Sequence, residues 1–149
     1  MKRKLILVSL LLITTLLNSN AQCNFENLLD SLKKQIATDE ILLENFNVYL
    51  YRSDTLGALP VAKFPINYEK ETTYRIRIIS DQVNYSPGGI VQLVEGNVLK
   101  GTNYSVRNKK CFDSFDFINP FKREGELIIY FEDGKEGCAV VTLSKIKKE

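Results

Sequence analysis

Three apolar runs of strand length stand close together near the C-terminus: CFDSFDFI (111–118), ELIIYFED (126–133) and CAVVTLS (138–144). Pro120 lies in the first break between them and Gly134 in the second, and both residue types favour turns. In the first run Phe115 and Phe117 alternate with Ser114 and Asp116, as in a strand whose side chains point to opposite faces in turn. The stretch predicts a β-meander that has Cys111 and Cys138 at its two ends.

The same alternation continues upstream, at residues 46–51, 61–68, 73–80, 90–95 and 98–104. Pro65 cannot donate a ladder hydrogen bond, which predicts an edge strand at 61–68. The run at 127–131 is apolar on both faces, which predicts a central strand. Short strands with no βαβ alternation predict an all-β fold with one N-terminal helix: an antiparallel β-sandwich, jelly-roll-like, of seven or eight strands, with an immunoglobulin-like outline as the alternative.

The predicted helix covers residues 24–37, where Phe25, Leu28, Leu29, Leu32 and Ile36 recur at helical spacing. Asn24 is the expected N-cap. Residues 38–45 fit either another helical turn or a run into the first strand, and the periodicity does not decide between these alternatives.

The N-terminus has the three parts of a secretory signal peptide: a basic start, an apolar run from Leu5 to Leu17, and small or polar residues up to Ala21. We therefore expect residues 1–21 to be a signal peptide, 22–45 the helix and its lead-in, and 46–149 the β-sandwich domain. Lipidation of Cys23 is disfavoured because Gln22 stands where a lipobox has a small residue. The expected location is outside the inner membrane: periplasm, outer surface or medium.

Charge argues against two classes of partner. The full chain has 20 Lys and Arg against 18 Asp and Glu, and the signal peptide contributes three of the basic residues. Removing three from 20 leaves 17 against 18, a formal charge of −1. Neither a nucleic acid nor an anionic membrane is expected as the partner. The apolar run of the signal is too short to span a bilayer, so no transmembrane segment is expected after cleavage.

The chain contains no histidine, which excludes Ser-His-Asp triads, Cys-His dyads and histidine-ligated metal sites. The acidic residues around the C-terminal runs match no calcium-loop spacing and are expected to be solvated. No catalytic residue, metal site or cofactor is predicted. A small hydrolase using paired carboxylates is kept as a minor alternative.

Three cysteines allow three pairings, each leaving one cysteine over. The favoured disulfide joins Cys111 to Cys138, since both begin predicted strands of an exported chain. The alternatives are a pairing that uses Cys23, and reduced, buried thiols.

The candidate partner-binding residues are outward-facing tyrosines and arginines. Arg75 and Arg77 alternate with inward apolar residues along one strand, and Tyr49 and Tyr51 do the same on another. Tyrosine and arginine dominate binding hot spots. The alternative is that they are ordinary outward residues of high β-propensity.

The strands also resemble known β-sandwiches. The segments ETTYRIRIIS (71–80), GIVQLVEGNVLKGTNYS (89–105), FDSFDFI (112–118) and EGELIIYFEDGKEGCAVVTLS (124–144) resemble pre-peptidase C-terminal and GOLD-type domains. They are also similar to small secreted Bacteroidetes proteins of unknown function. The resemblance implies a β-sandwich without a catalytic signature. The predicted function is an exported, non-catalytic module that binds a protein or glycan, with a possible low-order oligomer; the alternative is a structural accessory of an envelope or secretion assembly.

Overall fold

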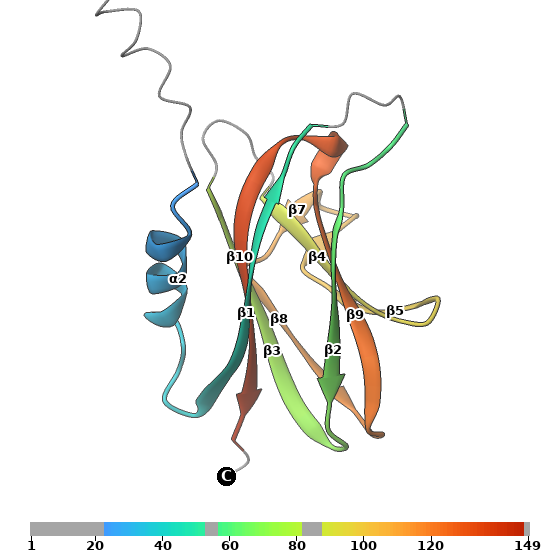
Figure 1. The fold of residues 1–149 in the computed structure, drawn as a ribbon. Helices are drawn as coiled ribbons and strands as arrows, with labels where there is room; N and C mark the ends of the chain where they lie inside the picture. The colour runs from blue at the N-terminus through green and yellow to red at the C-terminus, as the bar shows by residue number, and fades with distance from the viewer. Residues whose placement is uncertain (1–22, 53–56, 82–87, 148–149) are drawn as a thin grey trace, which may run out of the picture.

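The structure, a computed structural model, describes residues 23–52, 57–81 and 88–147. Two four-stranded antiparallel sheets pack face to face, with strand orders β1-β10-β3-β8 and β2-β9-β4-β5 (Figure 1). Most strands that follow one another along the chain lie in different sheets. The first sheet strand, β1, pairs with the last, β10. This order is that of a jelly roll, in which two Greek keys interlock. The predicted fold class is confirmed.

The eight sheet strands differ widely in length, from five to eleven residues. A two-stranded ribbon, β6 (Tyr104–Ser105) with β7 (Lys110–Cys111), caps one end of the second sheet. The strands of the two sheets are β1 (Glu40–Leu50), β2 (Ala62–Tyr68), β3 (Thr72–Asp81), β4 (Gly89–Glu95), β5 (Val98–Thr102), β8 (Ser114–Asn119), β9 (Arg123–Phe131) and β10 (Gly137–Ile146).

The core lies between the two sheets and is built from the alternating positions of every long strand. Side chains two residues apart point to the same face of a strand, so one set from each strand meets the facing sheet. The buried set is Phe46, Val48, Leu50, Ile66, Tyr68, Tyr74, Ile76, Ile78, Val91, Leu93, Leu127, Ile129, Phe131, Ala139, Val141 and Leu143.

Two strand positions in the sheets match the prediction. β2, which contains Pro65, is an edge strand and pairs only with β9. β9 lies between β2 and β4, so its apolar residues on both faces are explained by a central position. The ambiguous residues before Phe46 run into a strand, because β1 begins at Glu40.

The predicted β-meander is wrong. β8 and β10 belong to the first sheet, where β3 separates them, and β9 belongs to the other sheet. The break that contains Gly134 is not a hairpin of a meander but a 3-10 turn, η1 (Glu132–Gly134), that carries the chain from one sheet to the other. Alternation specifies which residues of a strand are buried, but it carries no information about the sheet in which the strand pairs.

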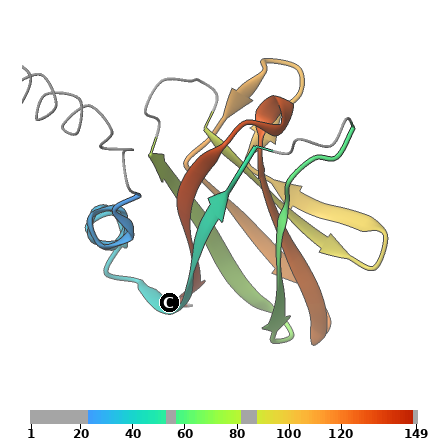
Figure 2. The same cartoon turned by 45° about the horizontal axis from the view of Figure 1, so that its top comes forward.

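A short helix, α2 (Phe25–Lys33), packs against β3 and β10 on the outer face of the first sheet (Figures 1 and 2). It ends at Lys33, before the predicted end at residue 37. The side chain of Asn24 accepts a hydrogen bond of 3.0 Å from the backbone N–H of Asn27, which confirms the predicted N-cap. Leu32 is the buried residue of the helix. The predicted signal peptide, residues 1–21, lies outside the described residues. Among the residues described, no helix is long and apolar enough to cross a membrane.

Candidate functional site

An exposed aromatic and aliphatic surface lies at the end of the sandwich where β1 finishes and β9 turns into β10. It combines Tyr49 and Tyr51 with Glu136, and with Leu59 beside the turn that carries Glu136; we call these four residues the tyrosine platform. Tyr51 is 72% exposed and Leu59 is 47% exposed, so both side chains are accessible to a partner. Large apolar side chains gathered on a surface are typical of interaction sites.

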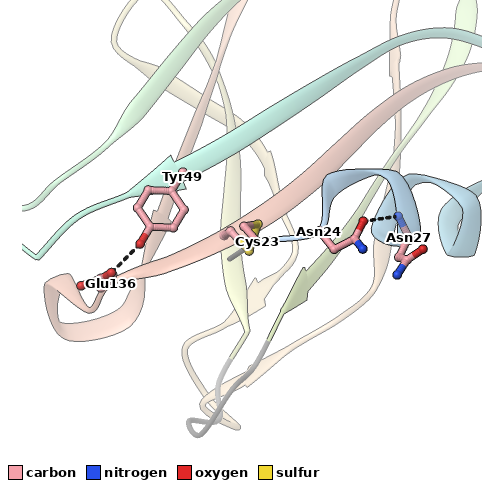
Figure 3. The surroundings of a disulfide bond; sticks show 6 residues. Cys23, Asn24, Asn27, Tyr49 and Glu136 are labelled. Atoms are coloured by element: carbon pink, nitrogen blue, oxygen red, sulfur yellow. Dashed lines mark hydrogen bonds between the residues drawn. A yellow bond between two sulfur atoms is a disulfide. The ribbon is translucent and has the colours of Figure 1, made fainter. Parts of the chain in front are cut away.

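The two tyrosine rings of the platform contact each other because residues two apart in an extended chain lie on the same face. Their centroids are 4.5 Å apart and the planes are inclined by 69°, an edge-to-face arrangement. The Tyr49 hydroxyl donates a 2.6 Å hydrogen bond to the Glu136 carboxylate (Figure 3). This bond, followed by burial and the charge of Glu136, raises the pKa of Tyr49. Tyr49 is therefore held as a protonated donor.

The turn between β9 and β10 holds the remaining part of the tyrosine platform in place. Asp133 and Gly134 both adopt positive φ angles, 58° and 64°. A side chain on Gly134 would begin 3.5 Å from Pro60 and 3.6 Å from Leu59, which places the turn beside the Leu59-Pro60 segment. The same turn carries Glu136, so it connects Leu59 on one side with Tyr49 on the other.

The predicted arginines point away from the core, as expected, but Arg77 is not exposed. Arg77 is 7% exposed and forms an ion pair with Glu40, whose carboxylate is buried. Arg75 bridges Glu40 at 2.7 Å and Asp116 at 2.5 Å. The expectation of two accessible arginines is corrected for Arg77, because its guanidinium is satisfied within the chain. Partner binding by Arg75 stays a prediction.

The Glu40 carboxylate is stabilised in its charged form by these arginines. The hydrogen bond from Arg77 is the largest influence, and together with the charge of Arg77 and the contacts of Arg75 it outweighs burial, so the pKa of Glu40 is lowered. The group is an internal ion-pair network that connects β1, β3 and β8.

The predicted Cys111–Cys138 disulfide is wrong: Cys138 is bonded to Cys23 (Figure 3). Cys111 is a free thiol. Cys138 points to the outer face of its sheet because its neighbour Ala139 occupies an inward position. Cys23 enters α2 on that same outer face, whereas Cys111 lies on the β6–β7 ribbon, 3.6 Å from the Gly88 carbonyl oxygen. The pairing that uses Cys23, kept as an alternative from the sequence, is the one observed.

A cavity of about 340 Å³ opens beside Cys111. Its wall includes Ser80, Asn103, Lys109 and Lys110. Burial, and then the charge of Glu132, raise the pKa of Cys111, so this thiol is not activated as a nucleophile. Within the described residues, no group of three or more His, Cys, Asp or Glu side chains is placed to hold a metal ion.

Several carboxylates near the C-terminal strands, expected to be solvated, have partners in the chain. Asp116 binds Arg75, Glu132 accepts a 3.0 Å hydrogen bond from Tyr104, and Glu136 accepts one from Tyr49.

Sequence reasoning missed the contribution of Glu136 and Leu59 to the tyrosine platform. No local pattern in the sequence marks either residue, because Glu136 meets Tyr49, and Leu59 meets the Gly134 turn, only after the sheets have formed.

Comparison with known proteins identifies no family for this chain. No family model matches it, and no curated protein matches it. A similar solved structure is that of PliG from Aeromonas hydrophila, described as a periplasmic lysozyme inhibitor of g-type lysozyme. The likeness has 8% sequence identity and a TM-score of 0.46, and covers 72% of this chain and 86% of that one. A likeness at this level carries no information about what this chain binds. The resemblance to pre-peptidase C-terminal and GOLD-type domains is supported only as a β-sandwich fold.

Proposed function

We propose that this chain is an exported, non-catalytic binding module whose partner is a protein, and that the tyrosine platform is its contact surface. The observation that carries the proposal is the pair of exposed tyrosines in edge-to-face contact, of which Tyr49 is held by its hydrogen bond to Glu136. Exposed Leu59 lies beside the same turn. A rigid aromatic surface loses little side-chain entropy on binding, which favours affinity.

Export is supported by the signal-like N-terminus and by the Cys23–Cys138 disulfide, since disulfides persist in oxidising compartments. We propose that residues 1–21 are removed and that the mature chain begins near Cys23. The sulfur of Cys23 is used in the disulfide, which is incompatible with a lipid thioether on the same atom. The proposed module is therefore not anchored through Cys23.

A protein suits the platform better than a glycan does. Sugar rings stack on flat aromatic faces, but the planes of Tyr49 and Tyr51 are inclined by 69° and do not form one flat surface. Leu59 adds an aliphatic contact that suits protein side chains. The Tyr49 hydroxyl is already used by Glu136, which leaves fewer polar groups for sugar hydroxyls.

A non-catalytic role is supported by the chemistry of the titratable groups. The chain has no histidine to act as a base near neutral pH. The Cys111 thiol has a raised pKa, and Glu40 is committed to two arginines. Neither Cys111 nor Glu40 is therefore suited to proton transfer or nucleophilic attack, and the chain has no histidine for this role.

The test is capture of envelope proteins by the immobilised chain lacking residues 1–21, followed by direct affinity measurement with the captured protein. We expect Tyr51→Ala with Leu59→Ser to weaken binding by about tenfold or more, as for removal of hot-spot residues. Ile118→Ala, an exposed change on β8, is the matched control and should leave affinity unchanged.

Three outcomes would reject the proposal. Equal affinity in the platform variant and the unsubstituted chain would exclude the platform as the contact surface. Loss of affinity in the Ile118→Ala control would move the contact to the edge at β8. Platform-dependent binding of glycans, with no protein partner, would reject the choice of partner.

A further inference from the structure

The edge strand β1 is the longest of the four edge strands in the two described sheets. The other edge strands are β8 beside β3, β2 beside β9, and β5 beside β4. β2 contains Pro65, β5 is five residues long, and β8 is six residues long. β1 has eleven residues, with neither proline nor a basic residue. Natural proteins usually protect such an edge, since its free N–H and C=O groups accept another strand.

β1 is also accessible in the described structure. It pairs only with β10, and α2 packs on β3 and β10 rather than along the free edge of β1 (Figure 2). A register shift between Leu42 and Glu44 divides the strand, so the regular part begins at Glu44. The side chains of Glu44, Asn45 and Asn47 are exposed along it.

We propose that two copies of this chain pair through β1, antiparallel and centred on Val48, to form one continuous eight-stranded sheet. A two-fold axis through Val48 places each residue opposite the one at the mirrored position of the second copy. Asn47 then faces Tyr49 of the copy on the outer face of the sheet. Asn45 faces Tyr51, which directly follows the end of β1 at Leu50, so this pairing extends the strand by two residues to Arg52. On the inner face, Phe46 is opposite Leu50 and both are apolar.

Charge complementarity selects this register. Centring on Val48 places Glu44 opposite Arg52 of the second copy, and symmetry makes this pair twice. Both side chains are exposed, and within the described part of the chain neither has an ion-pair partner. Centring one residue earlier, on Asn47, would place Glu44 opposite the apolar Leu50. Opposite charges across a strand pair are stabilising and like charges are destabilising.

A charge exchange tests the proposal while leaving the tyrosine platform unchanged. Sedimentation and light scattering of the chain lacking residues 1–21 should give a concentration-dependent dimer. Glu44→Arg and Arg52→Glu should each weaken dimerisation by about tenfold or more, since each places two like-charged pairs in the dimer. The double variant Glu44→Arg/Arg52→Glu should restore it. Asp113→Arg, an exposed acidic-to-basic change away from β1, is the matched control.

A cross-linking experiment tests the register itself. In a Cys111→Ser background, Asn45→Cys with Tyr51→Cys should give a covalent dimer on mild oxidation, because the two positions face each other between copies. A variant with only one of these cysteines should not form a covalent dimer. In that variant, the same cysteine in the second copy lies several residues away along the strand. The variants should keep the far-ultraviolet spectrum of a folded β protein.

The proposal is overturned if the unsubstituted chain stays monomeric at the highest soluble concentration. It is also overturned if the double charge variant fails to restore the dimer, or if single cysteines cross-link as well as the pair. Partner capture by the tyrosine platform is measured separately, so failure of dimerisation and failure of the proposed function are distinguishable.

Discussion

At the scale of single residues, Glu40 is a carboxylate whose side chain has no exposed surface. Its side chain is buried, with two arginines as partners at its oxygens. Removing one member of a buried ion pair leaves an uncompensated charge in a medium of low polarity. The side chain at residue 40 therefore matters to stability although it belongs to an edge strand.

We predict that Glu40→Gln lowers the free energy of unfolding by about 3 kcal/mol near neutral pH. The folded-state pKa of Glu40 is lowered, so its contribution is present above the unfolded-state pKa, about 4.3. The contribution is lost as the pH falls through the lower folded-state pKa. The difference between the variant and the original chain should therefore shrink on acidification. Urea unfolding at several pH values measures it.

The control for this prediction is Glu124→Gln, an exposed change on β9. It should alter stability by less than about 0.5 kcal/mol at every pH. A constant difference between Glu40→Gln and the original chain, from neutral to acidic pH, would contradict the assignment of the charged form to Glu40.

At the scale of elements, α2 depends on its attachment to the sheet. An isolated helix of nine residues is too short to be stable in water. The described structure provides a covalent attachment at Cys23, the Asn24 cap, and the burial of Leu32. The two cysteines are 115 residues apart in the sequence, so the loop that the disulfide closes includes most of the sandwich.

We predict that Cys23→Ser with Cys138→Ser increases amide hydrogen exchange in α2 more than in β3 and β10. The loss of free energy of unfolding should reach up to about 4 kcal/mol, because the unfolded chain regains the freedom of a long loop. Exchange mass spectrometry and chemical denaturation measure the two effects. Cys111→Ser removes a free thiol and is the matched control. An equal loss of amide protection in α2 of the Cys111→Ser variant would contradict the role given to the disulfide.

At the scale of the whole molecule, the two sheets stabilise each other through one shared core. Ile129 lies on the central strand β9 and has no exposed surface, whereas Ile118 on the edge strand β8 is 61% exposed. Because both residues are isoleucines, truncating each to alanine compares the effect of burial on the free energy of unfolding at a constant residue type.

We predict that Ile129→Ala lowers the free energy of unfolding by about 2–5 kcal/mol, since it removes buried methyl groups and leaves a cavity. Ile118→Ala should change it by less than about 0.5 kcal/mol. Equilibrium denaturation of both variants checks the difference. Similar losses at the two positions would mean that β8 is covered in solution.

Much of the fold was predictable because burial has a local signature. Alternation predicted the inward residues of β2, β3 and β9, and Pro65 predicted an edge. The candidate site was predictable in part: Tyr49 and Tyr51 were identified as exposed residues of one strand. Arg77 was assigned to the right face, but its burial depends on Glu40, which lies far away in the sequence.

The amino-acid sequence by itself determined the class of fold, the helix with its N-cap, and the faces of the strands, because these follow from the local period of apolar residues. Only the tertiary structure decided which strands share a sheet, which cysteine pairs with Cys138, and that Glu136 and Leu59 join the tyrosines. The physical reason is that those contacts connect residues far apart in the chain. Local alternation is equally compatible with many pairings of the same strands.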